Sequence, residues 1–78
     1  MAPMARQPRI TGVQLLQALI KDGWFEHRRV GSHVQLKHAV KPGRVTVPFH
    51  GGVILKPKIL ATALKQAGLT AADLRDLL

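Results

Sequence analysis

The sequence predicts a small α+β domain in which a helix is followed by three antiparallel strands, a second helix and a short third helix. Three observations support this order. Apolar residues recur at helical spacing toward both ends of the chain, as on the buried face of a helix. The middle of the chain alternates apolar and polar residues, a pattern typical of strands with one buried face. Glycine and proline separate these segments, and 78 residues suffice for one domain with one small core.

A capping box predicts where the first helix begins. Thr11 and Gln14 have the required spacing, in which each side chain bonds the backbone of the other residue. An apolar stripe follows, and Gly23 supplies a left-handed stop, so we expect a helix over residues 12–22. The stripe comprises Leu15, Leu16, Leu19 and Ile20.

Two strands joined by a tight turn follow this helix. Residues 24–30 and 33–39 form the strands, around a turn at Gly31-Ser32. In the second strand aliphatic side chains alternate with polar ones, and we expect the aliphatic ones to face the helices. A two-residue loop sets the register. The resulting pairs are Arg29 with Val34, Arg28 with Gln35, and Glu26 with Lys37.

A third strand completes the sheet and defines its open face. It covers residues 44–47 after a turn at Lys41–Gly43, and Pro48 ends it. Outward side chains of neighbouring strands share one face because side chains alternate along each strand. His38 falls on the inward face, where we expect it to pack at the sheet edge. The open face carries Arg28, His33, Gln35, Lys37, Arg44 and Thr46.

The last part of the chain predicts two helices. One follows Pro57 and stops at Gly68. Its buried stripe comprises Ile59, Leu60, Ala63, Leu64 and Ala67. Thr70 caps the final helix, with Asp73 in the first turn, where the helix dipole favours a carboxylate. The apolar edge of this helix either closes the core or offers an anchor to a partner, and it comprises Leu74, Leu77 and Leu78.

The charge of the chain restricts its partners. Twelve Lys and Arg against four Asp and Glu give a net charge of +8, which favours an anionic partner such as nucleic acid, an acidic protein or a membrane surface. From His27 to Ala72 the sequence has eight Lys or Arg residues, all four histidines and no carboxylate. We therefore predict an anion-binding face.

Composition also limits location and covalent chemistry. The chain has no cysteine, which excludes disulfides, thiol catalysis and thiolate metal sites. Residues 1–10 contain two prolines and no hydrophobic period, so we expect a flexible basic tail there and a single domain over 11–78. No signal peptide and no membrane span are apparent. We expect a cytoplasmic protein without a membrane partner.

A histidine among fixed cations suits chemistry on a phosphodiester. His33 can move a proton near neutral pH, and neighbouring Lys and Arg can stabilise the charge of a phosphorane. Cleavage of RNA also requires an acid for the leaving oxygen. Water or a second histidine such as His50 could supply that proton. The alternative is that His33 is an ordinary surface histidine.

Other chemistries fit the sequence less well. The histidine spacings match no compact ligand pattern, and two-metal chemistry needs carboxylates that this region lacks, so we expect no metal and no cofactor. Ser32 and His33 are adjacent and point apart, which argues against a serine hydrolase. Gly51-Gly52 lacks the Lys and Ser/Thr of a phosphate-binding loop.

Several short motifs occur in a specific order between Ile10 and Leu69. They are Lys21-Asp22-Gly23-Trp24, Arg28, Gly31-Ser32-His33, Lys41-Pro42-Gly43-Arg44, Val45-Thr46-Val47-Pro48 and Leu64-Lys65-Gln66-Ala67-Gly68-Leu69. In this order they resemble the HicA-type mRNA interferase toxins. The resemblance implies a double-stranded-RNA-binding-like fold and a type II toxin that cleaves mRNA without a metal. It also implies that His33, at the Gly-Ser-His position, is catalytic.

The resemblance further implies partners. A cognate HicB-type antitoxin would cover His33, and the pair would form a higher-order toxin–antitoxin complex. Expected RNA-binding residues are Arg28, Ser32, Lys37 and Arg44. A second interpretation is a double-stranded-RNA-binding-like module without chemistry, which reads RNA shape through 2′-OH and phosphate contacts. A small DNA-binding protein is less well supported, because no helix-turn-helix with a basic recognition helix is apparent.

Overall fold

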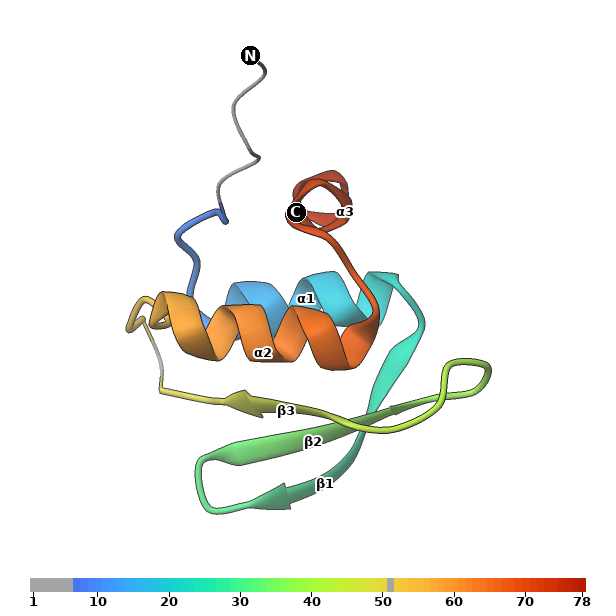
Figure 1. Cartoon of the computed structure of the whole chain (residues 1–78). Coiled ribbons are helices and arrows are strands. Elements are labelled where there is room, and N and C mark those ends of the chain that lie inside the picture. The colour runs from blue at the N-terminus through green and yellow to red at the C-terminus, as the bar shows by residue number, and fades with distance from the viewer. Residues whose placement is uncertain (1–6, 51) are drawn as a thin grey trace.

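The computed structural model describes residues 7–50 and 52–78 and confirms the predicted α+β element order (Figure 1). Residues 1–6 of the predicted tail therefore lie outside the described residues. The elements are α1 Gly12–Lys21, β1 Trp24–Val30, β2 His33–His38, β3 Val45–Pro48, α2 Pro57–Ala67 and α3 Ala71–Leu77. These bounds differ from the predicted ones by one residue at several ends, such as Asp22, which is the C-cap of α1.

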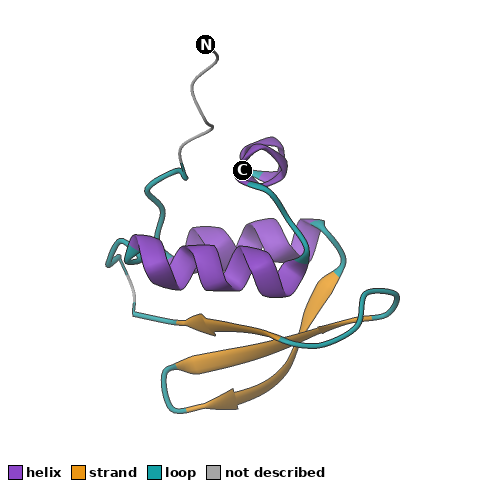
Figure 2. Ribbon diagram, viewed as in Figure 1, coloured by secondary structure: helices purple, strands orange, loops and turns teal. Residues whose placement is uncertain are grey.

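The domain is layered. The strands form an antiparallel sheet in the order β1-β2-β3. Helices α1 and α2 lie on one face of this sheet, and α3 lies beyond them, away from the strands (Figure 2). Helix α3 contacts α1, and both α1 and α2 contact β3. No described helix covers the opposite face of the sheet, which leaves the predicted open face exposed.

The core fills the space between the sheet and the helices. Its fully buried large side chains are Trp24, Leu15, Leu19, Leu36, Leu60, Leu74, Val34, Val45 and Val47. Ile10, which the sequence placed in the tail, is also buried, and its carbonyl accepts a hydrogen bond from the backbone N–H of Leu55 at 2.8 Å. The prediction that Ile20 and Ile59 belong to the core is wrong, because both side chains lie on the solvent side of their helices.

Helices α1 and α3 begin at the predicted cap residues, Thr11 and Thr70. At α1 the side chains of Thr11 and Gln14 bond reciprocally to the backbone. The same arrangement joins Thr70 and Asp73 at the start of α3. Because Leu74 of that helix is fully buried in the common core, α3 closes the hydrophobic core of its own chain.

The register of β1 against β2 is partly as predicted. Arg29 pairs with Val34 and Arg28 with Gln35, but the predicted pair of Glu26 with Lys37 is wrong. A bulge between Glu26 and Arg28 leaves His27 as an extra residue. The pairing beyond the bulge therefore shifts by one residue. Lys37 is paired with Phe25 instead.

Candidate nucleic-acid interface

His33 opens strand β2 at one end of the exposed sheet face. Its Cα is paired with Val30 on one side and Pro48 on the other. The next residue, Val34, is fully buried. The side chain of His33 consequently points away from the helices. The imidazole is exposed and makes no hydrogen bond or ion pair with any residue that the structure describes.

The turn before His33 is held by contacts that the sequence did not reveal. The backbone N–H of Phe49 donates to the carbonyl of Ser32 at 2.6 Å. The guanidinium carbon of Arg29 lies 4.9 Å from the centre of the Phe49 ring, within cation–π range. Glu26 accepts from Nε of Arg29 at 3.2 Å. These contacts hold the turn against the residues that follow β3, and they thereby fix the position at which β2 begins.

The predicted RNA-binding cations share the face with His33. Arg28 and Gln35 are opposite one another in the sheet, and Nη1 of Arg44 donates to Oε1 of Gln35 at 3.4 Å. Lys37 lies two residues further along β2, on the same face. Neither Arg28 nor Lys37 makes a hydrogen bond or ion pair with the described residues. Their charges are therefore available to an external anion.

Ser32 occupies a different position. It is half-buried in the turn between β1 and β2, outside the strands themselves. Its carbonyl is engaged by Phe49. Its hydroxyl has no partner among the described residues. Ser32 thus adjoins His33 along the chain without joining the row of cations on the sheet.

The carboxylates do not neutralise this face. Asp22 pairs with Lys41 at 2.6 Å, and Glu26 pairs with Arg29 at 3.2 Å. Asp73 and the remaining carboxylate, Asp76, belong to α3. Glu26 is opposite Leu36, whose buried side chain marks the helix side of the sheet. The open face is accordingly cationic, as the charge pattern predicts.

His38 has a structural role on the opposite side of the sheet. Its Nε2 lies 2.7 Å from the carbonyl oxygen of Asp22, and its Nδ1 is 3.0 Å from the backbone nitrogens of Val40 and Lys41. Its ring meets Trp24 edge-on with centroids 5.1 Å apart. This confirms the expected inward packing at the sheet edge. His27, in the bulge, and His50, after β3, are exposed.

Asp22 connects several of the short motifs to one another. One carboxylate oxygen accepts from Nζ of Lys41 and, at 3.2 Å, from Nε1 of Trp24. Nζ of Lys41 also donates to the carbonyl of Ala67 at 3.1 Å. Residues from three motifs therefore meet at the end of α1 and stabilise the fold rather than the open face.

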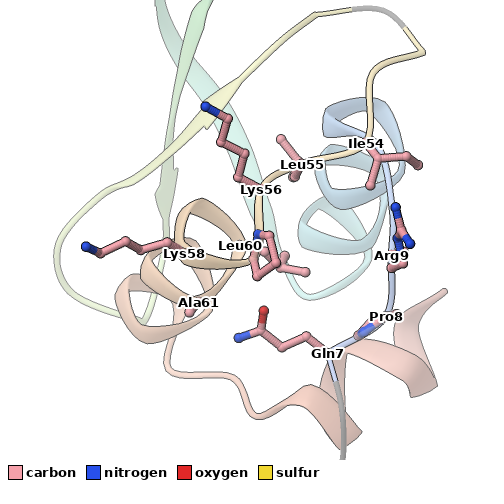
Figure 3. Close-up of a pocket in the computed structure, with 10 residues that line it drawn as sticks. Gln7, Pro8, Arg9, Ile54, Leu55, Lys56, Lys58, Leu60 and Ala61 are labelled. Atoms are coloured by element: carbon pink, nitrogen blue, oxygen red, sulfur yellow. The ribbon is translucent and has the colours of Figure 1, made fainter.

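A hollow of about 800 Å³ lies apart from the sheet, between the segment before α1 and the start of α2 (Figure 3). Gln7 extends across it toward Leu60 and Ala61, while the amines of Lys56 and Lys58 point away (Figure 3). None of the residues predicted for catalysis or RNA binding lines this hollow. The candidate site is thus the open sheet face.

The described part of the chain has neither a metal-binding cluster nor a membrane-spanning helix. Among those residues, no group of three histidine or carboxylate side chains gathers where it could hold a metal ion. None of the helices described is both long and apolar enough to cross a lipid bilayer.

The fold and the site together define a class: small α+β proteins that present an exposed histidine beside cations on one face of the sheet. The family model for the HicA toxin of bacterial toxin–antitoxin systems matches residues 12–69. The chain belongs to this family and is the toxin of a toxin–antitoxin pair, which implies an antitoxin partner. A search of curated proteins found no match.

Proposed function

We propose that this toxin is a metal-independent endoribonuclease that cleaves mRNA, with His33 as its proton-transfer residue. One observation carries the proposal. His33 is exposed and unpartnered among the described residues, on a face whose available charges are cations. A general base must reach its proton directly or through one water, and an unobstructed imidazole satisfies that requirement.

The proposed reaction needs only groups on or near this face. The imidazole of His33 takes the proton of a ribose 2′-OH, and the 2′ oxygen forms a bond to the adjacent phosphorus. Cations stabilise the negative charge of the pentacoordinate phosphorane. The bond from phosphorus to the 5′ oxygen then breaks. Water or His50 protonates that oxygen, so the products are a 2′,3′-cyclic phosphate and a 5′-hydroxyl.

Four residues would bind the RNA around His33. Arg28, Lys37 and Arg44 would hold phosphates, since they share its face and Arg28 and Lys37 have no internal partner among the described residues. The Ser32 hydroxyl, adjacent in the chain, would add a hydrogen bond. Phosphate contacts of this kind orient the backbone without reading its sequence.

We further propose that the antitoxin is an acidic, HicB-type protein that covers His33. It must compete with RNA for the same cations, so carboxylates opposite Arg28, Lys37 and Arg44 would speed association. The toxin would act on mRNA in the cytoplasm when released from a higher-order complex. In the complex, His33 should resist chemical modification by diethyl pyrocarbonate. A His33 that still reacts would show that the antitoxin inhibits from elsewhere.

Incubation of the purified toxin with RNA in excess EDTA tests the enzymatic proposal. We expect fragments that end in cyclic phosphate, and none with a His33→Gln protein purified in parallel. Stable complexes with uncleaved RNA would instead support a binding module of the double-stranded-RNA-binding type, which the α-β-β-β-α order also allows.

A further inference from the structure

Phe25 is an aromatic side chain left in solvent on the cationic face. It follows Trp24, which is almost fully buried, so it points to the other side of the sheet. Its pairing with Lys37 places it in the same row as that cation. Half of its surface, 50%, is exposed. Among the described residues, Phe25 belongs neither to the buried core cluster nor to the partly buried apolar side chains packed against it.

A cationic hollow lies at the same end of the sheet, and Lys37, the strand partner of Phe25, lines it. It measures about 370 Å³ and is lined by Lys37 and His38 at the end of β2, by Arg44, and by the loop between β2 and β3. The third cation in its wall, Lys41, is engaged by Asp22 and Ala67. The ammonium of Lys37 has no partner among the described residues. The hollow therefore offers positive charge for a phosphate beside an exposed aromatic ring.

We propose that Phe25 stacks on an unpaired base of the RNA while Lys37 and Arg44 hold the neighbouring phosphate. This inference rests on the proposed function and specifies its substrate class as single-stranded RNA. Aromatic rings between cations bind single strands because each base has a π-face that stacks. In a duplex those faces are covered by neighbouring base pairs, so a duplex cannot use Phe25.

The distance from His33 gives Phe25 a role in binding rather than in chemistry. Lys37, the partner of Phe25, is four residues from His33 along β2. At a rise of about 3.3 Å per residue, the pair of Phe25 and Lys37 lies about 13 Å from His33 along the strand. The stacked base therefore lies to one side of the bond that is cleaved. Phe25 would retain the strand while the proton transfer takes place at His33.

The test measures binding without cleavage. The probes are a fluorescent single-stranded RNA that is fully 2′-O-methylated, which removes the 2′-OH nucleophile, and the same strand in a duplex. Variants are Phe25→Leu, which keeps an apolar side chain, and Phe25→Tyr, which keeps a stacking ring. Ile20→Ala is the control, because Ile20 is exposed to a similar extent, 53%, on a helix away from this face.

We expect Phe25→Leu to weaken binding of the single strand about tenfold, because leucine has no ring on which a base can stack. Phe25→Tyr should bind within about twofold of wild type, and duplex affinity should be unchanged. Equal losses for single strand and duplex would overturn the proposal. So would unchanged single-strand affinity in Phe25→Leu.

Two other outcomes separate this inference from the proposed function. If Phe25→Leu loses affinity for the antitoxin but keeps its affinity for RNA, Phe25 is a protein anchor and the stacking proposal is wrong. If wild type binds the single strand through Phe25 yet never cleaves unmodified RNA, the nuclease proposal fails while the stacking proposal stands. A toxin that binds no single-stranded RNA overturns both.

Discussion

The Nε2 atom of His38 lies 2.7 Å from the backbone carbonyl oxygen of Asp22. The Nδ1 atom of the same ring accepts from the backbone N–H groups of Val40 and Lys41. With Nδ1 as the acceptor, Nε2 is the ring nitrogen that donates to the carbonyl of Asp22. The ring joins the end of α1 to the loop after β2. His38 is thus tied into the fold, whereas His33 is available to a ligand.

Removal of the His38 ring should destabilise the domain without affecting the open face. We expect His38→Ala to lower the free energy of unfolding by about 2–4 kcal/mol, because three hydrogen bonds, each worth roughly 0.5–1.5 kcal/mol, are lost together with packing on Trp24. His27→Ala, in the exposed bulge, is the control and should stay within about 0.5 kcal/mol. Urea denaturation measures both. If His38→Ala and His27→Ala have equal free energies of unfolding, His38 does not stabilise the fold.

A side chain at position 23 should disturb the contact between Nε2 of His38 and the carbonyl oxygen of Asp22. Gly23 has φ of 101°, and a Cβ there would lie 2.6 Å from Nε2 of His38. Gly43, with φ of 80° and nothing within 4 Å of its Cβ position, is a matched control for backbone strain. We expect Gly43→Ala to lower the free energy of unfolding by about 1 kcal/mol. Gly23→Ala should lower it clearly more in the same urea denaturation assay. If the two variants are equally stable, steric displacement of His38 contributes nothing.

The fold was largely predictable because its signals are local. Both capping boxes lie within four residues of sequence, and the alternation in β2 identifies Val34 and Leu36 as buried. Register beyond the bulge was not predictable, since an extra residue such as His27 leaves no mark in composition. Ile20 and Ile59 were misplaced because helical spacing defines a stripe but not its width.

The placement of the candidate residues on one face of the sheet was predictable, but the contacts that hold this face in position were not. Charge pattern and strand alternation place His33 with the cations on one face. The contact between Arg29 and Phe49 joins residues distant in the chain, so only the folded arrangement reveals it. The exposure of Phe25 on this face follows from the bulge, which changes its partner to Lys37. Both features depend on the folded arrangement of the strands, and local sequence pattern therefore does not reveal them.

Binding of RNA to the open face should weaken steeply with salt. If three to five phosphates are engaged, log K against log salt should have a slope of about −2 to −4 for a single strand. Lys37→Ala and Arg44→Ala should each make the slope shallower by roughly one unit at most. Lys21→Ala, at the end of α1, is the control and should leave it unchanged. Titrations of 2′-O-methylated RNA measure the slope, and a flat response would exclude this face as the main phosphate contact.

The cap of α3 should make stability depend on pH. Hydrogen bonds from the backbone and side chain of Thr70 lower the pKa of Asp73 below its ordinary value of 3.8. A depressed carboxyl pKa stabilises the fold above the unfolded pKa, and that contribution disappears as pH falls through the folded pKa. Wild type should thus be more stable than Asp73→Asn at pH 7, with the difference vanishing in acid below 3.8. Thermal denaturation across pH measures this, and a difference that persists in strong acid would contradict the assignment.

The cleavage rate of a folded His33→Ala toxin tests the central claim most directly. The variant and wild type are compared on one RNA in EDTA, and circular dichroism verifies that both are folded. Loss of a general base typically costs about 10²–10⁴-fold in rate, and we expect a decrease in that range with RNA affinity retained. A folded variant that cleaves within about threefold of the wild-type rate would show that His33 is not the proton-transfer residue.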